Sequence, residues 1–124
     1  MNRTVLIVED AEVCRDTLEI ALMSVPNVAV RSVTTAEEAL QWLAANKISA
    51  LVTDLRLPRM DGFALIQAVR SRCSTVPIVV ISGDSDPRVP AHVAGLGASA
   101  YFSKPFSPSE VLHKLEELIG SSAA

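Results

Sequence analysis

Five polar residues stand directly after short apolar runs of the sequence, where side chains from different strands can meet. Glu9 and Asp10 follow the first run, and Asp54 ends the third. Ser82 and Lys104 follow the fourth and fifth runs. Since ligand sites of parallel α/β folds lie at the carboxyl ends of the strands, the sequence predicts that three carboxylates, a hydroxyl and an ammonium group lie close together.

Three neighbouring carboxylates repel one another, which costs stability, and a bound cation would offset this repulsion. Mg²⁺ prefers oxygen ligands, taking few carboxylates together with phosphate and water, and Mn²⁺ suits the same donors. An Asp carboxylate can also attack phosphorus as a nucleophile. A metal and a lysine would stabilise the charge on a transferring phosphoryl group. Asp54 and Lys104 therefore indicate phosphoryl chemistry supported by Mg²⁺ or Mn²⁺.

The apolar runs alternate with amphipathic stretches, which is typical of βαβ units and a parallel sheet. The runs are short and rich in β-branched residues, as expected for strands that helices cover. The intervening stretches carry apolar residues at helical spacing. We predict one α/β domain with five helices and five parallel strands, doubly wound, the strands being residues 5–8, 28–33, 48–53, 76–81 and 100–103.

Three of the predicted helices have recognisable first turns. Thr35 and Glu38 form a capping-box pair. Asp61-Gly62 opens the next helix. Ser107-Pro108 places a capping residue ahead of a proline at the first helical position. These signals predict where the second, third and fifth helices begin.

The fourth helix is the weakest predicted element. It must lie between residues 86 and 97, a segment that contains Pro87, Pro90 and Gly95. Because proline is tolerated only in the first turn of a helix, we expect this helix to begin near Pro90 and to be short. A short helix of low stability is an element that a switch can reorganise.

The composition excludes several classes of function. Hydrophobic residues make up 49% of the 124 residues, but none of their runs approaches the roughly 18 that a membrane span needs. The first run lacks the cleavage site of a signal peptide. Cys14 and Cys73 are too few for a disulfide framework and lack metal-site spacing. A net charge of -3 without a Lys/Arg cluster argues against direct nucleic-acid binding. We expect a soluble cytoplasmic protein.

The sequence resembles the response-regulator receiver domains of two-component signalling over residues 4–119. Each motif that carries the resemblance stands at the end of the corresponding strand: Glu9-Asp10, residues 54–62 (DLRLPRMDG), Ser82-Gly83, Gly97-Ala98 and Lys104-Pro105-Phe106. Each is common alone, and their combination is specific. The resemblance implies a flavodoxin-like fold with strand order 2-1-3-4-5. The receiver domain would span residues 1–120, with a tail or the start of a linker at 121–124.

Carried over by position, the resemblance implies that Asp54 is the phosphoacceptor and Asp10 a direct metal ligand. Glu9 would hold the metal through water, and the backbone carbonyl of Arg56 would be a further ligand. Lys104 would pair with the phosphoryl oxygens.

The resemblance also implies a switch. Ser82 would move to the phosphoryl group, and Tyr101 would swing inward after it. Pro105 would follow a cis peptide bond, which proline makes accessible. Arg56 and Asp84 flank the expected pocket mouth, and our hypothesis is that they pair across it and slow hydrolysis of the phosphoryl group.

These features predict a phosphoacceptor that is phosphorylated by a histidine kinase or a histidine phosphotransfer protein. Such a domain is not a classical enzyme, although weak self-phosphotransfer and autodephosphorylation are expected. Output would use the face made by the fourth helix, fifth strand and fifth helix. The output partner, the pathway and a phosphorylation-dependent homodimer stay open. No effector domain follows residue 120, which leaves a stand-alone regulator and a piece of a larger protein both open.

Three other functions fit the sequence less well. A pseudo-receiver that only binds proteins would be favoured by loss of Asp10, Asp54 or Lys104, and all three are present. An Asp-nucleophile phosphatase would carry Asp-x-Asp-x-Thr after the first strand. A flavodoxin-like cofactor binder would need a Gly/Ser/Thr phosphate loop at residues 10–16, where DAEVCRD would repel phosphate.

Overall fold

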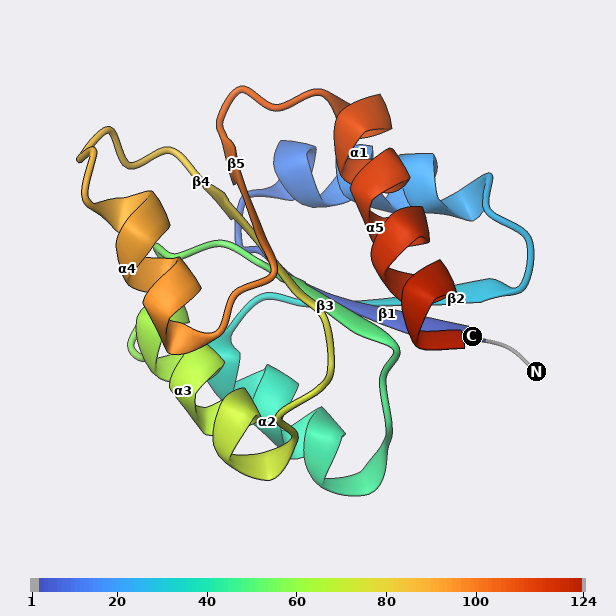
Figure 1. Ribbon diagram of the computed structural model, residues 1–124, viewed down its shortest axis with the longest axis horizontal. Coiled ribbons are helices and arrows are strands. Elements are labelled where there is room, and N and C mark those ends of the chain that lie inside the picture. Colours follow the sequence, from blue (N-terminus) through green and yellow to red (C-terminus); the bar gives the residue numbers. More distant parts are fainter. Residues whose placement is uncertain (1–2, 124) are drawn as a thin grey trace.

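The fold is a parallel sheet with helices on both faces, seen in a computed structural model that describes residues 3–123 (Figure 1). The strand order is β2-β1-β3-β4-β5, and every neighbouring pair is parallel. This confirms the predicted flavodoxin-like order. The strands are β1 (Arg3–Val8), β2 (Val28–Val33), β3 (Ala50–Thr53), β4 (Ile78–Ser82) and β5 (Ala100–Ser103). The helices are α1 (Glu12–Met23), α2 (Ala36–Ala45), α3 (Gly62–Arg72), α4 (Val89–Leu96) and α5 (Pro108–Ala123).

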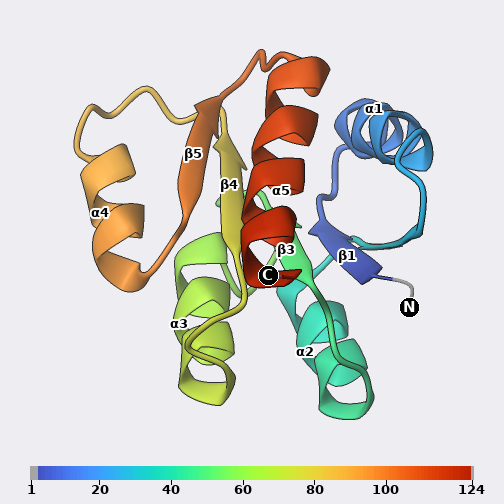
Figure 2. The ribbon, with the colours of Figure 1, turned by 45° about the vertical axis from the view of Figure 1, so that its right-hand side comes forward.

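The sheet divides the core into two layers, and helices cover each of them (Figures 1 and 2). Side chains alternate along β1, so that Leu6 and Val8 face one layer while Val5 and Ile7 face the other. The first layer contains buried residues of α2, α3 and α4, and the second contains those of α1 and α5. Because both faces are covered, the strands hold their carboxyl ends at one rigid edge.

The three predicted helix starts are present. The Thr35 hydroxyl accepts a hydrogen bond from the Glu38 N–H at 3.1 Å, and the Asp61 carboxylate accepts one from the Ala64 N–H at 2.9 Å. The Ser107 hydroxyl accepts a longer one from the first turn of α5, at 3.3 Å. Each contact satisfies a backbone donor that the helix itself leaves unpaired.

Several boundaries differ from the prediction: β1 begins two residues early, at Arg3, and β4 ends one residue late, at Ser82. β3 begins two residues late, at Ala50, and β4 two residues late, at Ile78. Pro77 cannot donate to a ladder, and its carbonyl accepts from the Leu51 N–H at 2.9 Å just before the strand pairing begins. The last helix continues past Gly120 to Ala123. Gly120 does not adopt the left-handed conformation that ends a helix.

α4 is as short as predicted, with eight residues and Pro90 in its first turn. Its first turn has no side-chain cap. It ends at Gly97, whose φ of 109° is left-handed, a conformation that glycine adopts without steric cost. The helix therefore depends on its neighbours more than on its own caps.

Two contacts tie α4 to α3. The rings of Phe63 and His92 stack with centroids 4.7 Å apart. Arg70 donates from Nε and Nη2 to the Gly97 carbonyl at 3.0 and 2.6 Å. A third bond, from Arg70 Nη1 to the Val76 carbonyl at 2.6 Å, links the same side chain to the entry of β4. Arg70 thus holds the C-terminal end of α4. The N-terminal end of α4 follows the loop that leaves β4 at the carboxyl edge of the sheet.

A candidate phosphoryl site at the carboxyl edge of the sheet

Three carboxylates meet where β1 and β3 end. These strands are neighbours, so the residues that follow Val8 and Thr53 lie side by side. Glu9, Asp10 and Asp54 each offer one oxygen, and these oxygens all lie within 4.8 Å of one another. Glu9 and Asp54 are buried, with exposed fractions of 2% and 6%, whereas Asp10 is exposed. The structure therefore brings together the three carboxylates that the sequence singled out.

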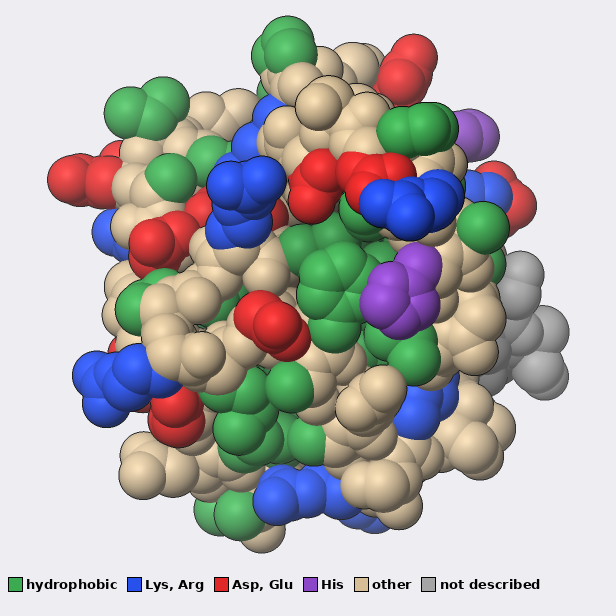
Figure 3. Space-filling view, turned by 90° about the vertical axis from the view of Figure 1, so that its left-hand side faces the viewer, with side chains coloured by type: hydrophobic (Ala, Val, Ile, Leu, Met, Phe, Trp, Pro, Cys, Tyr) green, Lys and Arg blue, Asp and Glu red, His purple; other side chains and the backbone are tan. Residues whose placement is uncertain are grey.

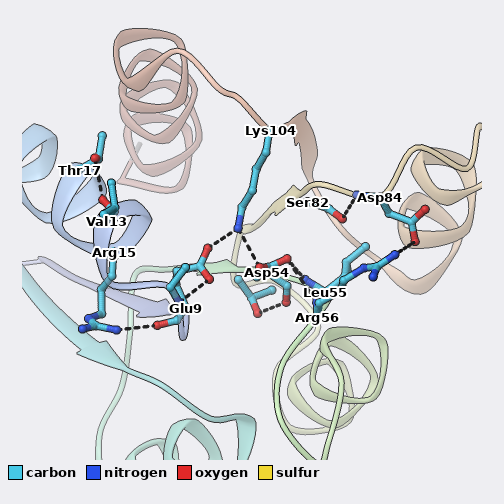
Figure 4. Close-up of polar contacts among 12 residues, drawn as sticks. Glu9, Val13, Arg15, Thr17, Asp54, Leu55, Arg56, Ser82, Asp84 and Lys104 are labelled. Atoms are coloured by element: carbon cyan, nitrogen blue, oxygen red, sulfur yellow. Dashed lines mark hydrogen bonds and ion pairs between the residues drawn. The ribbon is translucent and has the colours of Figure 1, made fainter.

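Lys104 reaches into this cluster from the end of β5 (Figure 4). Its Nζ lies 2.7 Å from Glu9 Oε1 and 2.9 Å from Asp54 Oδ2. Burial alone would lower the pKa of the ammonium, but the hydrogen bonds to Glu9 and Asp54 outweigh it and hold the pKa of Lys104 above its usual range. The side chain is consequently charged at neutral pH and faces the carboxylate that is proposed to react.

The second oxygen of Asp54 is held by the backbone. Oδ1 accepts hydrogen bonds from the N–H groups of Leu55 at 2.7 Å and Arg56 at 3.3 Å. The Thr53 hydroxyl donates to the Asp54 carbonyl at 2.8 Å. The Asp54 carboxylate is thus oriented by backbone N–H groups at Oδ1 and by Lys104 at Oδ2. The role of the Arg56 carbonyl as a metal ligand stays a prediction.

Ser82 and Tyr101 both contact Asp84. Ser82 is fully buried at the end of β4, and its hydroxyl accepts from the Asp84 N–H at 3.1 Å. The half-buried Tyr101 donates from its hydroxyl to the Asp84 carbonyl at 3.5 Å. The two residues proposed to respond to phosphorylation therefore share one loop residue.

Arg56 and Asp84 form an ion pair, with 3.8 Å between Nη2 and Oδ2 (Figure 4). The Arg56 side chain is 78% exposed, and exposed ion pairs contribute little to stability. Acidic and basic side chains lie next to each other around a hydrophobic patch on this side of the molecule (Figure 3). The Lys104–Pro105 peptide bond is cis.

Three contacts of the site were not predicted from the sequence. Arg15 donates from Nη1 to the Glu9 carbonyl at 3.1 Å, and the Ala11 N–H donates to Glu9 Oε2 at the same distance. Gly62 packs against the chain just after β3, where a Cβ atom would contact the Asp54 carbonyl oxygen and lie 2.6 Å from Leu55 Cα. The Asp61-Gly62 pair was interpreted as a helix start and as part of the 54–62 motif, but not as a close contact of Asp54, and Arg15 carries no sequence signal of its own.

The donor set fits a hard divalent cation. All three ligand candidates are carboxylates, which Mg²⁺ prefers. One ammonium group against three carboxylates leaves excess negative charge in a largely buried place. Glu9, Asp10 and Asp54 are the residues that would hold the ion.

Comparisons with known proteins agree with this geometry. The model of the response regulator receiver domain matches residues 5–116. The transcriptional regulatory protein GltR of Pseudomonas aeruginosa is 35% identical over 120 residues, covering 95% of this chain and 49% of that protein. The response regulator MprA of Mycobacterium ulcerans is 33% identical, covering 96% of this chain and 51% of that protein. The chain thus spans about half the length of these curated relatives.

Solved structures show the same fold. A response regulator receiver protein from Pseudomonas putida has 32% identity and a TM-score of 0.82, with 98% of each chain covered. The receiver domain of a sensor histidine kinase from Pseudomonas aeruginosa has 25% identity and a TM-score of 0.84, covering 97% of this chain and 99% of that one. That structure has a magnesium ion coordinated in its active-site cleft. Within residues 3–123, no helix is long and apolar enough to cross a membrane. The chain belongs to the response regulator receiver domain family.

Proposed function

We propose that this domain is a Mg²⁺-dependent phosphoacceptor switch whose phosphorylated residue is Asp54. The observation that carries the proposal is the position of the Asp54 carboxylate, with Lys104 2.9 Å from one oxygen and two further carboxylates beside it. The test is Mg²⁺-dependent incorporation of one phosphoryl group from a small phosphodonor, with Asp54→Asn as the control. A protein-binding pseudo-receiver would incorporate none.

The proposed reaction is a phosphoryl transfer to a carboxylate. An Asp54 oxygen forms a bond to phosphorus while the bond from phosphorus to a donor histidine nitrogen breaks, and the bonding electron pair leaves with that nitrogen. The Leu55 and Arg56 N–H groups hold Asp54 oriented, and the Lys104 ammonium faces the charge that develops on the phosphoryl oxygens. A bound Mg²⁺ supplies further neutralisation of that charge. Slow hydrolysis of the same bond resets the switch.

The output is proposed to start at Asp84. If Ser82 turns toward a phosphoryl group on Asp54, it gives up its hydrogen bond with the Asp84 N–H, and the Asp84 carbonyl that Tyr101 contacts moves with it. The loop continues into α4, whose first turn has no side-chain cap. Its far end is held by Arg70. A change at Asp54 would thereby shift the start of α4 and the face that it forms with β5 and α5.

The phosphodonor is proposed to be a histidine kinase or a histidine phosphotransfer protein that covers α1. Three large hydrophobic side chains are exposed on this helix: Val13 at 81%, Ile20 at 69% and Met23 at 75%. The spacing of seven and three residues places them on one face. α1 begins two residues after Asp10, so this face adjoins the site that a donor must reach.

Ile20→Glu is expected to slow phosphoryl transfer from the donor protein by at least about tenfold, because a charge would enter an apolar contact. Transfer from acetyl phosphate should keep its rate, since that donor needs no docking surface. Both rates are measured by mass spectrometry of the intact protein. His113→Glu adds the same charge at an exposed position of α5 and should change neither rate. Equal slowing with both donors would contradict the docking role of α1.

Arg56→Ala is expected to speed loss of the phosphoryl group roughly two- to fivefold, because an exposed ion pair is worth at most about 1 kcal/mol. Asp84→Ala should act alike, and the double variant should add little, since both remove one contact. Arg88→Ala breaks another exposed arginine pair of the same loop, with Asp86, and is the matched control. Unchanged rates of phosphoryl loss in both single variants would contradict the hypothesis that this ion pair slows hydrolysis.

Some assignments rest on the sequence and stay proposals. The domain is taken as residues 1–120, with a tail or linker start at 121–124, although α5 continues to Ala123. Three further proposals rest on the sequence in the same way: a cytoplasmic location, the absence of direct nucleic-acid binding and a phosphorylation-dependent homodimer. Partner capture and sizing with and without a phosphoryl mimic test the last of these.

A further inference from the structure

A concave region lies at the opposite edge of the sheet from Asp54. It is a groove of about 420 Å³ between the C-terminal ends of α2 and α3, which lie side by side (Figure 2). This volume is within the range of about 300–1,000 Å³ that small-molecule sites occupy. The phosphoryl chemistry does not use this region.

The floor of the groove is apolar and packed into the core. Val69 and Val76 are 3% and 7% exposed, and both belong to the buried layer beneath α2 and α3. Leu43 and Ile48 are half-buried and pack against the same layer. Because Val69 and Val76 are already shielded, a ligand with an apolar body would remove from water chiefly the exposed parts of Leu43 and Ile48.

The rim of the groove is cationic. Lys47 and Arg72 line it, and both are exposed. No Asp or Glu is among the described residues that line the groove. Arg70 adds a third positive charge nearby through its bond to the Val76 carbonyl. The two helix C-termini contribute only about −0.5 charge each, so the positive charge prevails.

An adjoining shallow depression of the surface has the same cationic character. It is about 270 Å³ in volume and shares Ile48, Cys73 and Val76 with the groove. Arg3 lines it, and again no carboxylate is among its described lining residues. In a protein of net charge −3, this edge is therefore a local site of positive potential, opposite in sign to the acidic edge at Asp54.

We propose that the groove binds a small amphipathic anion, an alkyl or aryl carboxylate. Its apolar part would contact Leu43 and Ile48 above the buried floor, and its carboxylate would face Lys47 and Arg72. The site would be a second ligand site of the domain, separate from the phosphoryl site. Its affinity should be modest, with a dissociation constant on the order of 1 mM, because the groove is open and the ligand small.

Cys73 provides a reporter inside the groove. It is exposed, and hydrogen bonds from the backbone and hydroxyl of Thr75 lower the pKa of its thiol. Cys14 is half-buried, and burial together with the neighbouring Glu9 raises the pKa of its thiol to about 12. A neutral reagent such as iodoacetamide should therefore alkylate Cys73 at least about tenfold faster than Cys14.

The test is titration of the full chain with sodium octanoate, followed by amide chemical shifts and by iodoacetamide labelling. Saturable shifts should be confined to residues 43–48 and 69–76, and labelling of Cys73 should slow severalfold. Acetate, which lacks an apolar body, and 1-octanol, which lacks a charge, are the matched probes and should bind more weakly. Absence of saturable shifts, or shifts spread over the whole surface, would overturn the proposal.

Charge recognition is tested with Lys47→Ala and Arg72→Ala together, which should weaken octanoate binding about three- to tenfold. Lys114→Ala removes a lysine from α5 and should leave binding unchanged. Equal binding of octanoate and 1-octanol, or an unchanged constant in the double variant, would show that the groove takes apolar ligands without regard to charge and would overturn the anion assignment. The amide spectra of the variants without octanoate serve as an independent check that they are folded.

Discussion

Replacing Lys104 with methionine is expected to lower the free energy of unfolding in Mg²⁺-free buffer by about 3 kcal/mol. Lys104 Nζ contacts Glu9 and Asp54 at 2.7 and 2.9 Å. Both carboxylates are almost fully buried, so the variant leaves two charges without their partner in a place that water barely reaches. Urea unfolding with a chelator present measures the loss.

Two further measurements show whether charge is the cause. Glu9→Gln in the Lys104→Met background should recover part of the loss, so that the two substitutions are not additive. Mg²⁺ should stabilise Lys104→Met more than the wild type, because the cation replaces the missing ammonium charge. If the losses from Lys104→Met and Glu9→Gln simply add, the bridge does not stabilise the site as described. The Lys104 variant should also accept phosphoryl groups far more slowly.

Gly62→Ala is expected to cost about 3 kcal/mol of stability and to slow phosphorylation of Asp54 roughly ten- to a hundredfold. An added Cβ would contact the Asp54 carbonyl oxygen and lie 2.6 Å from Leu55 Cα. Both contacts are backbone, which has no side-chain rotation to relieve them. The chain must therefore shift at the residue whose carboxylate has to be placed accurately.

Gly95→Ala is the matched control for Gly62→Ala. Gly95 also lies in a helix, and its added Cβ would meet nothing within 4 Å. Alanine favours helix over glycine, so this variant should gain about 0.5–1 kcal/mol and keep its phosphorylation rate. A Gly62→Ala variant with wild-type stability and rate would contradict the role given to this close approach.

The sequence predicted the architecture because its periodicity is strong. Continuous apolar runs and capping residues such as Thr35 and Asp61 indicate both the type of each element and where the helices begin. The predicted bounds of the strands were less accurate, because a strand begins where its backbone can hydrogen-bond to a neighbouring strand. Pro77, with no N–H, moves the start of β4 to Ile78. A tail or linker was expected after residue 120, but the exposed Gly120 continues the helix to Ala123.

The side chains at the carboxyl edge were predictable because parallel strands bring their ends together. What could not be predicted were contacts set by three-dimensional packing. That Lys104 bridges Glu9 and Asp54 depends on side-chain reach from the end of β5 past β4 to the ends of β3 and β1. The contact of Arg70 with the Gly97 carbonyl joins residues 27 positions apart, and no local pattern encodes it.

The central claim is that Asp54 accepts a phosphoryl group with help from a divalent cation. Incubation of the chain with acetyl phosphate, followed by intact mass and peptide analysis, measures this directly. We predict a gain of one phosphoryl group, located on Asp54, that depends on Mg²⁺ and disappears in Asp54→Asn and in the presence of a chelator. An unchanged mass with Mg²⁺ present, or the same gain in Asp54→Asn, would contradict the account.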